Sequence, residues 1–520
     1  MNNLSEIFLA IPFNPINQTT LPDIQVTGIT LDSRKVTPGD IFVAVIGGSS
    51  DGHAFISNAI ENGAVAIIGS KSLKNNLPVP YLQVENPRFT LAHIAAALMD
   101  FPARKMTMIG VTGTDGKTTT ATLLYHILKQ AGIKVGLITT VSMIMGGEEV
   151  DTGFHVTTPE AVDVQRYLAH MAAVGITHVV LETTSHGLAQ NRVTACEFDI
   201  GIITNITHEH LDYHGSYGAY QDAKGMLFED VSRQKKKLFI PPNLAVLNKD
   251  DQSYTFLKQL IDAPFQSYST SDPTGDVFAS AIQHQPDGLH FSLHDSHGII
   301  PISSTLIGNF NISNILAAYT AAVAGLGISP KTAAEGIAAM AGVPGRMERI
   351  NMGQEFLAVV DFAHTPNGLK VALETLKGIV PPGGRIWAVF GSAGLRDRKK
   401  RAMMAEVSAQ FSDNTILTAE DPRTESLDDI LAVMSEAAKS KGAIQGQNLW
   451  SIPDRGKAIQ FAIDHAKRAD IICAFGKGHE QSMCFGTTEH AWDDRIVMRA
   501  ALAKHLGVDG PEIPYLPTQD

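Results

Sequence analysis

Cysteine is scarce in this chain of 520 residues, which has only Cys196, Cys473 and Cys484. They are far apart and form no C-x-x-C pair, so the sequence excludes a disulfide framework and a cysteine-rich zinc site. No apolar run approaches the roughly 18 residues of a membrane span. The first residues, MNNLSEIFLAIPF, carry no basic segment before their short apolar patch. We therefore expect a cytoplasmic protein without membrane insertion.

Positive charge is also in short supply. Lys and Arg total 41 against 53 Asp and Glu, which gives a formal net charge of -12. A general nucleic-acid binder carries the opposite excess, so this function class is disfavoured. An anionic small molecule would have to be held by a few local lysines and arginines.

Length and hydrophobic content indicate several domains. With 520 residues, 44% of them hydrophobic, the chain is too long for a single core, and about three domains of ordinary size are expected. We place them at residues 1–105, 106–345 and 346–520. The first reads as a small α/β unit that ends near Phe101-Pro102.

In the second and third regions, apolar runs alternate with helical patterns, which is typical of a mostly parallel sheet covered on both faces. The expected strands are 106–112, 135–139, 177–181, 200–204, 356–360, 385–390, 414–417 and 470–474. Polar–apolar alternation at 277–284 and 288–293 predicts an antiparallel flap before a helix at 311–324. The predicted fold class is α/β, with a small N-terminal domain, a central P-loop-type domain and a C-terminal Rossmann-like doubly wound domain.

The segment Gly110–Thr119, GVTGTDGKTT, follows the short apolar run Met106–Ile109 and opens a helical pattern. Its glycines let backbone N–H groups close around phosphate oxygens, Lys117 reaches the outer phosphates, and the Thr118 hydroxyl can ligate Mg²⁺. The loop is a variant, because Val111 stands where the generic pattern has its first glycine. The alternative is a glycine-rich turn with an incidental lysine, but the helix that follows favours a nucleoside triphosphate site.

Ligands of open parallel sheets lie beyond the carboxyl ends of the strands. Glu182 ends a strand of the sheet that carries the phosphate loop, where a carboxylate can hold Mg²⁺; a capping carboxylate is the alternative. The run 205–214, NITHEHLDYH, follows another strand. We favour a magnesium and phosphate site there over a solvated loop or a zinc site, because the H-E-x-x-H spacing is absent. The turns 420–423 and 476–480 would face the same cleft if the two sheets oppose each other.

An ordered series of motifs runs through nearly the whole chain. It comprises TLDSR (30–34), PGDIFVA (38–44), the loop 113–119, TTP (157–159), SHGL (185–188), HLDYHG (210–215), the segment 308–314, GRME (345–348), DFAHTP (361–366), DPRTE (421–425) and GKGHE (476–480). With this series the sequence closely resembles the Mur ligase family, and within it the MurE-type UDP-N-acetylmuramoyl-tripeptide synthetases. A lone phosphate loop would be weak evidence, whereas the ordered set is close to diagnostic.

The resemblance implies an ATP- and Mg²⁺-dependent ligase that adds a diamino acid to UDP-N-acetylmuramoyl-L-alanyl-D-glutamate during peptidoglycan precursor synthesis. In the family's reaction ATP phosphorylates a substrate carboxylate, and an amino acid amine attacks the acyl phosphate through a tetrahedral intermediate. Magnesium and Lys117 would offset charge on the transferring phosphoryl group.

The resemblance also implies the site residues, position by position. The ATP contacts are Gly113, Thr114, Asp115, Gly116, Lys117, Thr118, Thr119, Asn311, Arg346 and Asp361. The UDP-muramoyl-peptide contacts are Leu31, Ser33, Gly48, Thr157, Thr158, Thr184, Gln190 and Arg192. The amino-acid contacts are Arg396, Glu420, Asp421, Pro422, Arg423, Gly476 and Glu480. The metal ligands are Thr118, Glu182, His210 and Lys224, and the catalytic residues are Lys117, His210 and Lys224.

Lys224 falls where the family carries a carbamylated lysine that supports a second magnesium. Reaction with CO₂ turns an ammonium that would repel Mg²⁺ into an oxygen ligand. Without the resemblance, a solvated helix lysine is the favoured interpretation.

The identity of the diamino acid stays open between meso-diaminopimelate, L-lysine and L-ornithine. Family members that add meso-diaminopimelate usually read Asp-Asn-Pro-Arg at this turn, whereas this chain reads Glu420-Asp421-Pro422-Arg423. The carboxylate of Asp421 removes a donor and adds negative charge, which favours a free distal ammonium. The fork of Arg423 suits a carboxylate instead.

Two other hypotheses remain. A related amide ligase with another acceptor, such as a folylpolyglutamate synthetase, is disfavoured by the UDP-type first region. A non-catalytic, nucleotide-regulated binding protein is disfavoured by Lys117, Glu182 and His210. Acceptor-dependent ADP release would separate these hypotheses, and we expect the active protein to be a monomer.

Overall fold

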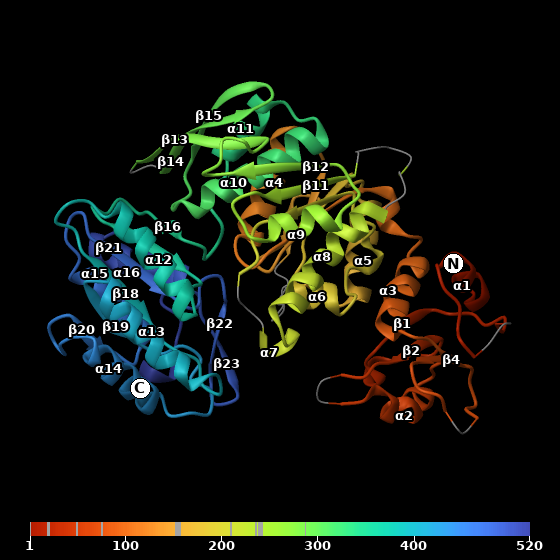
Figure 1. Cartoon of the computed structure of the whole chain (residues 1–520). Coiled ribbons are helices and arrows are strands. Elements are labelled where there is room, and N and C mark those ends of the chain that lie inside the picture. Colours follow the sequence, from red (N-terminus) through yellow and green to blue (C-terminus); the bar gives the residue numbers. More distant parts are fainter. Residues whose placement is uncertain are drawn as a thin grey trace. The chain divides into compact units, whose positions relative to one another are not determined.

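The computed structural model describes residues 2–17, 21–47, 50–73, 76–150, 158–207, 211–233, 237, 243–285 and 288–519. The chain divides into two compact units (Figure 1). One unit consists of Met1–Ala281, Phe291–Ile302 and Ile312–Ala339, and the other of Ile282–His290, Ser303–Asn311 and Met340–Asp520. Within the described ranges, every helix is too short or too polar to cross a membrane.

The first unit begins with a small parallel sheet in the order β1-β2-β3-β4. Its strands are β1 (Gly28–Thr30), β2 (Asp40–Ala44), β3 (Ala66–Gly69) and β4 (Tyr81–Gln83). Apolar residues of α1 (Leu4–Ala10) and α3 (Pro87–Leu98) pack on one face of the sheet, and those of α2 (Ile56–Glu61) pack on the other.

The central sheet has the order β15-β14-β13-β12-β11-β10-β5-β9-β6-β7-β8. Its strands are β5 (Thr107–Thr112), β6 (Val135–Ile138), β7 (Met143–Met145), β8 (Glu148–Val150), β9 (His178–Glu182), β10 (Ile200–Ile203), β11 (Leu244–Asn248), β12 (Phe265–Ser269), β13 (Val277–Gln285), β14 (Gly288–Asp295) and β15 (Gly298–Ser304). The core strand β5 pairs in parallel with β9 and β10. In this register Val111 lies opposite Glu182 and Thr112 lies opposite Ile203, so the loops after all three strands leave the sheet at the same edge.

Helices accompany the central strands. They are α4 (Lys117–Gln130), α5 (Ala161–Ala173), α6 (Ser185–Ala189), α7 (Leu211–His214), α8 (Tyr217–Arg233), α9 (Ser253–Leu260), α10 (Phe310–Thr320), a π-helical turn (Ala321–Gly325) and α11 (Pro330–Ala338). The apolar residues of α5, α8 and α9 form one core with the sheet. Because the sheet is buried under helices, its inner strands read as continuous apolar runs.

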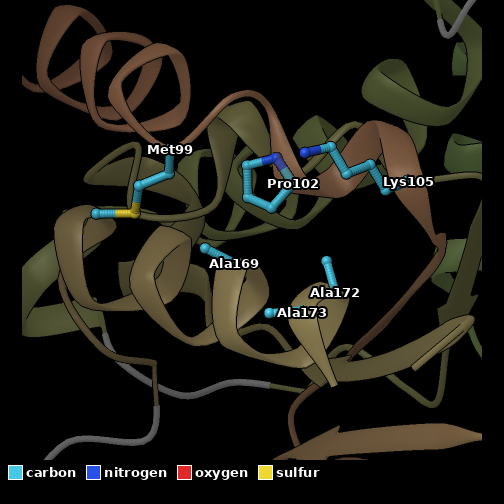
Figure 2. A pocket seen from close by; sticks show the side chains of 6 residues that line it. All are labelled: Met99, Pro102, Lys105, Ala169, Ala172 and Ala173. Atoms are coloured by element: carbon cyan, nitrogen blue, oxygen red, sulfur yellow. The ribbon is translucent and has the colours of Figure 1, made fainter. Parts of the chain in front are cut away.

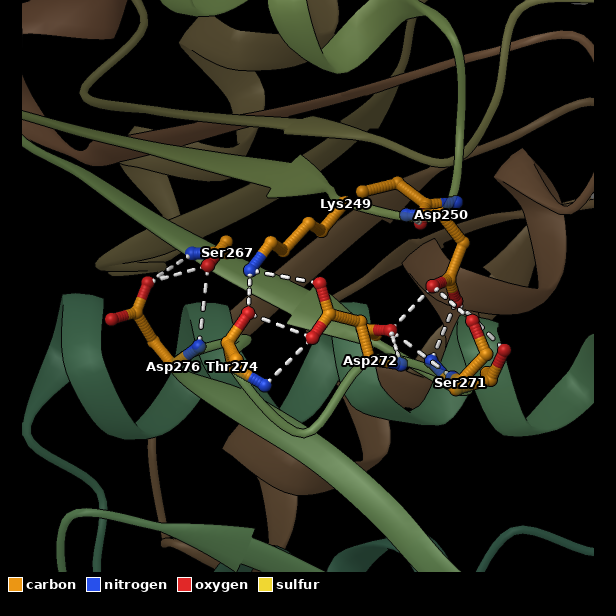
Figure 3. Close-up of polar contacts among 10 residues, drawn as sticks. Lys249, Asp250, Ser267, Ser271, Asp272, Thr274 and Asp276 are labelled. Atoms are coloured by element: carbon orange, nitrogen blue, oxygen red, sulfur yellow. Dashed lines mark hydrogen bonds and ion pairs between the residues drawn. The ribbon is translucent and has the colours of Figure 1, made fainter.

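The segment predicted as an antiparallel flap is joined to the central sheet. Strand β13 pairs in parallel with β12, and β14 and β15 follow it, so the segment extends the central sheet. A polar cluster at the carboxyl ends of β11 and β12 fixes the connection to β13 (Figure 3). Asp250 accepts from the Thr270 N–H at 2.6 Å and from the Ser271 hydroxyl at 2.8 Å, while Lys249 pairs with Asp272 at 3.0 Å.

The second unit contains a sheet in the order β16-β17-β21-β18-β19-β20, parallel except for β16. The strands are β16 (Glu348–Ile350), β17 (Leu357–Asp361), β18 (Ile386–Phe390), β19 (Asn414–Leu417), β20 (Leu449–Ser451) and β21 (Ile471–Phe475), with a separate hairpin of β22 (Ser482–Phe485) and β23 (Thr488–Ala491). The helices are α12 (Pro366–Ile379), α13 (Arg398–Phe411), α14 (Leu427–Ser440), α15 (Arg455–Asp464) and α16 (Asp494–Leu506). Apolar residues of α12, α13 and α14 form one core with the sheet, and those of α15 and α16 form another. Helices therefore cover both faces, and the predicted doubly wound, Rossmann-like domain is confirmed.

Candidate active site

The phosphate loop joins β5 to α4 and depends on two glycines. Gly113 has φ of +148° and Gly116 has φ of +82°, values that L side chains rarely adopt. A Cβ at Gly113 would lie 1.8 Å from the Thr204 hydroxyl oxygen, and one at Gly116 would lie 2.2 Å from the Asn314 carboxamide oxygen. The loop therefore runs too close to its neighbours for any side chain at these positions.

The turn after β10 holds the phosphate loop in place. Asn205 accepts from the N–H of Thr114 with its main-chain oxygen at 2.8 Å and from the N–H of Asp115 with its side-chain oxygen at 3.0 Å. The Thr204 hydroxyl donates to the Asp115 carbonyl at 2.6 Å. In the sequence, this contact is indicated only by the position of Asn205 directly after a predicted strand.

Lys117, Thr118 and Glu182 lie where the sequence predicts a magnesium and phosphate site. Lys117 Nζ donates to the Thr114 carbonyl at 2.6 Å, so its ammonium lies over the loop. The Thr118 hydroxyl donates to Glu182 Oε2 at 2.9 Å, and Glu182 is buried. A hydroxyl beside a buried carboxylate is the hard-oxygen donor set that Mg²⁺ prefers, so these residues fit the ion.

Thr140 is a further residue at this candidate site, outside the residues predicted from the sequence. Its N–H donates to Glu182 Oε2 and its hydroxyl donates to Oε1, both at 3.1 Å. With Thr118, these donors fix both carboxylate oxygens. Thr140 stands in the turn between β6 and β7, and no motif in the sequence marks it.

Lys224 lies on α8 and is almost fully buried, with 1% of its surface exposed. Its Nζ donates to the Gly113 carbonyl and lies 4.6 Å from the centre of the Tyr220 ring. The Tyr220 hydroxyl in turn bonds the Thr114 hydroxyl at 2.9 Å. The interpretation of Lys224 as a solvated helix lysine is therefore wrong, because the residue packs against the phosphate loop.

Three predicted site residues, Gly48, Thr157 and His210, lie outside the described residues. Within the described ranges, no three His, Cys, Asp or Glu side chains group closely enough to form a metal site. Of the run 205–214, residues 208–210 lie outside the described ranges, and His214 bonds the Ser185 hydroxyl at 3.1 Å.

Four of the predicted muramoyl-peptide residues come together around α6. The hydroxyls of Thr158 and Thr184 lie 3.1 Å apart, and Arg192 donates to the Thr158 carbonyl at 2.7 Å. Arg192 also donates to the Gln190 side chain at 2.7 Å and pairs with Glu160 at 2.9 Å. This local cluster presents hydroxyl, amide and guanidinium groups, which suit a peptide carrying carboxylates.

The other two described residues of the predicted muramoyl-peptide set, Leu31 and Ser33, lie just after the first strand of the small sheet. Leu31 follows β1 directly, and Ser33 starts a 3₁₀ turn (Ser33–Lys35) that Asp32 caps. Asn62 donates to the Ser33 carbonyl at 2.9 Å, which fixes this turn.

The second unit holds the remaining predicted ATP contacts. Asp361 ends β17 and accepts from the N–H groups of Met347 at 2.7 Å and Ala363 at 2.8 Å. Burial raises the pKa of Asp361, and the positive charge of Arg346 opposes that shift. Arg346 lies over the Phe362 ring at 4.5 Å, and its Nε has no partner among the described residues. Asn311 bonds the Ile307 carbonyl at 2.7 Å.

The predicted amino-acid contacts converge at the carboxyl ends of β18, β19 and β21. A Cβ at Gly394 would lie 1.9 Å from the Pro422 carbonyl, and one at Gly476 would lie 2.3 Å from Glu420 Oε2. The loop before Arg396 and the turns 420–423 and 476–480 therefore touch one another. Asp421 and Arg423 have φ of +41° and +55°, and such left-handed backbone in residues with a side chain is concentrated at functional sites.

Asp421 is an ion-pair partner of Lys477 within the turn 420–423. Lys477 Nζ lies 3.0 and 3.1 Å from its two oxygens, and the Cys484 N–H donates to it at 2.9 Å. Lys477 also pairs with Glu480 at 2.6 Å. The charge of Asp421 is thus offset from inside the protein, which removes the basis for expecting it to select a free ammonium.

Glu420 and Arg423 retain unused hydrogen-bonding capacity. Glu420 is buried, and its Oε2 has no partner among the described residues; the same holds for Nε of Arg423. Burial raises the pKa of Glu420, while Arg455, Lys400 and Lys477 oppose the shift. The turn therefore carries one free acceptor and one free donor.

Two surface cavities lie apart from these residues. One, of about 170 Å³, is lined by Met99, Pro102, Lys105 and three alanines of α5 (Figure 2). Its charged group, Lys105, is paired with Asp100 at 2.7 Å. Another, of about 330 Å³, is lined by residues that include His284, Phe310 and Val371. Neither contains a predicted site residue.

Comparison with known families places three models along the chain. The model of the Mur ligase family catalytic domain matches residues 25–101, the Mur ligase middle domain matches 111–322, and the Mur ligase glutamate ligase domain matches 345–478.

Whole-length relatives agree with these matches. The UDP-N-acetylmuramoyl-L-alanyl-D-glutamate–2,6-diaminopimelate ligase of Geobacillus thermodenitrificans is 39% identical over 481 residues, 92% of this chain and 95% of that protein. The UDP-N-acetylmuramyl-tripeptide synthetase of Roseiflexus sp. is 40% identical over 94% of this chain and 96% of that protein. A solved structure of a UDP-N-acetylmuramoyl-L-alanyl-D-glutamate–2,6-diaminopimelate ligase superposes with a TM-score of 0.70 and 30% identity, over 97% of this chain and 100% of that one.

Proposed function

The chain belongs to the Mur ligase family, and on this premise we propose that it adds 2,6-diaminopimelate to UDP-N-acetylmuramoyl-L-alanyl-D-glutamate. It is an ATP-dependent acid–amino acid ligase of peptidoglycan precursor synthesis. ATP phosphorylates the acceptor carboxylate, the amine attacks the acyl phosphate, and phosphate leaves as the amide forms.

The observation that carries the catalytic assignment is the meeting of Lys117, Glu182 and Lys224 at the loop after β5. Lys117 neutralises charge on the transferring phosphoryl group. Thr118 and Glu182 would hold Mg²⁺, which would supply further charge neutralisation on the phosphates. The N-terminus of α4, which begins at Lys117, would orient the phosphates for in-line transfer.

We also propose that Lys224 acts as a carbamate. Its burial against the Gly113 carbonyl places the Nζ atom beside the phosphate loop, where the oxygens of a carbamate would be available to a second magnesium. With His210, Lys224 would complete the metal ligands that the family pattern assigns. We further propose a cytoplasmic monomer with domain boundaries near residues 105 and 345.

The choice of diaminopimelate depends on Glu420 and Arg423. The distal end of diaminopimelate carries both an ammonium and a carboxylate, whereas that of lysine or ornithine carries an ammonium alone. Oε2 of Glu420 and Nε of Arg423 have no partner among the described residues, so Glu420 would accept from the ammonium and the guanidinium of Arg423 would bind the carboxylate. Because Lys477 already offsets the charge of Asp421, that residue does not oppose a distal carboxylate.

The test is kcat/KM for meso-diaminopimelate, L-lysine and L-ornithine, measured by ADP release with the same UDP-muramoyl dipeptide. We expect diaminopimelate to be preferred, and Arg423→Lys to lower this preference by about 1–3 kcal/mol, since a bidentate contact is lost. The control is Asp421→Asn, which removes the charge at position 421 and keeps a hydrogen-bonding side chain there. Equal use of the three amino acids by the wild type would contradict the assignment.

A further inference from the structure

Arg455 is a fully buried arginine outside the predicted site. It is the first residue of α15, and its side chain is 0% exposed. Its Nε and Nη2 donate to the two oxygens of Asp494 at 2.7 and 2.6 Å, and the Trp492 indole N–H donates to the same carboxylate at 2.9 Å. We call Arg455, Asp494 and Trp492 the upper triad.

The remaining donors of Arg455 hold two main-chain carbonyls. Nη1 donates to the Ala419 carbonyl at 3.1 Å, and Nη2 donates to the Phe475 carbonyl at 2.7 Å. Ala419 directly precedes Glu420, and Phe475 directly precedes Gly476. One rigid guanidinium thus fixes the starting points of both turns of the amino-acid pocket relative to each other.

The same sheet carries a matching group at its other end. Asp470 accepts from the Arg385 N–H at 2.9 Å, from Arg385 Nη2 at 3.0 Å and from the Trp387 indole N–H at 3.2 Å. This lower triad stands where β18 and β21 begin, whereas the upper triad stands where β19 and β21 end. Both triads join Arg, Asp and Trp, but the upper one alone bonds the carbonyls that lead into the pocket turns.

We infer that Arg455, held by Asp494 and Trp492, is a positioning residue that sets the geometry of the diamino acid pocket. The inference rests on the proposed function. A buried Arg–carboxylate pair is weak evidence for stability alone, because the desolvation of the two charges opposes their attraction. Here the pair orients a guanidinium whose other donors define a binding site. Arg455 also places positive charge near Glu420, which helps to keep that buried carboxylate ionised.

The test compares Arg455→Lys with Arg385→Lys. Lysine keeps the charge but lacks the planar fork, so it cannot hold Asp494 and both carbonyls together. We expect Arg455→Lys to raise KM for meso-diaminopimelate by about 10- to 100-fold, the range for losing hydrogen bonds to a charged group. KM for ATP should stay within about two-fold, and Arg385→Lys should leave both KM values near wild type. Thermal unfolding of both variants measures the structural loss of each, which should be smaller for Arg385→Lys because the Arg385 side chain is 38% exposed.

Trp492→Phe and Trp387→Phe form a milder pair, in which one hydrogen bond to each aspartate is removed. If Arg455→Lys does not fold, the test uses these two variants. Trp492→Phe should then raise KM for meso-diaminopimelate, whereas Trp387→Phe should leave it near wild type. A normal KM for diaminopimelate in folded Arg455→Lys overturns the inference, as does an equal rise in the lower-triad variant. Absence of diaminopimelate-dependent ADP release in the wild type overturns the proposed function itself, and the inference with it.

Discussion

Two lysines direct their ammonium groups at neighbouring carbonyls of the phosphate loop. Lys117 bonds the Thr114 carbonyl from within the loop, and Lys224 bonds the Gly113 carbonyl from α8, 111 positions further along the chain. A motif predicts Lys117, because its partner is three residues away. The contact of Lys224 depends on how α8 packs, so the residues around Lys224 in the sequence do not predict it.

Lys117→Ala should lower acceptor-dependent ADP release by about two to three decades, the usual effect of removing one group that neutralises transition-state charge. The fold should persist, because the side chain contributes one bond to a loop carbonyl. Lys129 is an exposed lysine on the same helix, so Lys129→Ala is the matched control. Near-normal turnover in folded Lys117→Ala would show that the loop has another role.

Lys224→Ala should be nearly inactive and partly rescued by formate or acetate, because a small carboxylate can supply the oxygens of the missing carbamate. Turnover is measured in bicarbonate-free buffer with each salt, and chloride at equal ionic strength is the control. Full activity of the variant without any added carboxylate would exclude a role in holding metal.

At the scale of elements, the helix that opens at the phosphate loop is held by a close helix contact. Helices α4 and α11 pack together, and a Cβ at Gly336 on α11 would lie 2.5 Å from Ile127 Cα on α4. Backbone meets backbone here, so no side-chain rearrangement can make room. The absence of a side chain at position 336 therefore sets how near α11 approaches α4.

Gly336→Ala should destabilise the protein by about 1–3 kcal/mol, because overpacking outweighs the gain in helix propensity. Gly378→Ala is the control, since Gly378 lies exposed near the end of α12 and a Cβ added there would meet no atom within 4 Å outside the adjacent backbone. That change should stabilise by roughly 0.5–1 kcal/mol. Urea unfolding midpoints of the two variants should move in opposite directions, and a shift of both toward stability would refute the packing argument.

Strand burial explains which elements the sequence could predict. Strands β5 and β18 are buried on both faces; β18 appears as an unbroken apolar run, and β5 as a largely apolar one. The three-residue strands β1 and β4 alternate in burial over too short a length to be recognised. The sequence predicts β13 as part of an antiparallel flap. Because the outer half of β13 is polar, the sequence does not indicate that the strand also pairs in parallel with β12.

At the scale of the whole molecule, one rule located most of the candidate site. In each of the two large sheets, predicted site residues lie at or just after the carboxyl ends of strands, as for Glu182 in one and Glu420 in the other. The rule points to turns but not to the side chains that support them. Thr140, Lys477 and Arg455 act on partners distant in sequence, so their roles became visible only from the packed structure.

Strand β5 lies between β9 and β10 in the interior of the central sheet, whose edges are β8 and β15. Sheets open from their edges, and the amide hydrogens of an inner strand exchange with solvent only when the surrounding structure unfolds. The strand that presents the phosphate loop should therefore be among the last parts of its unit to lose protection. Local opening that releases the outer strands leaves the attachment of the nucleotide site intact.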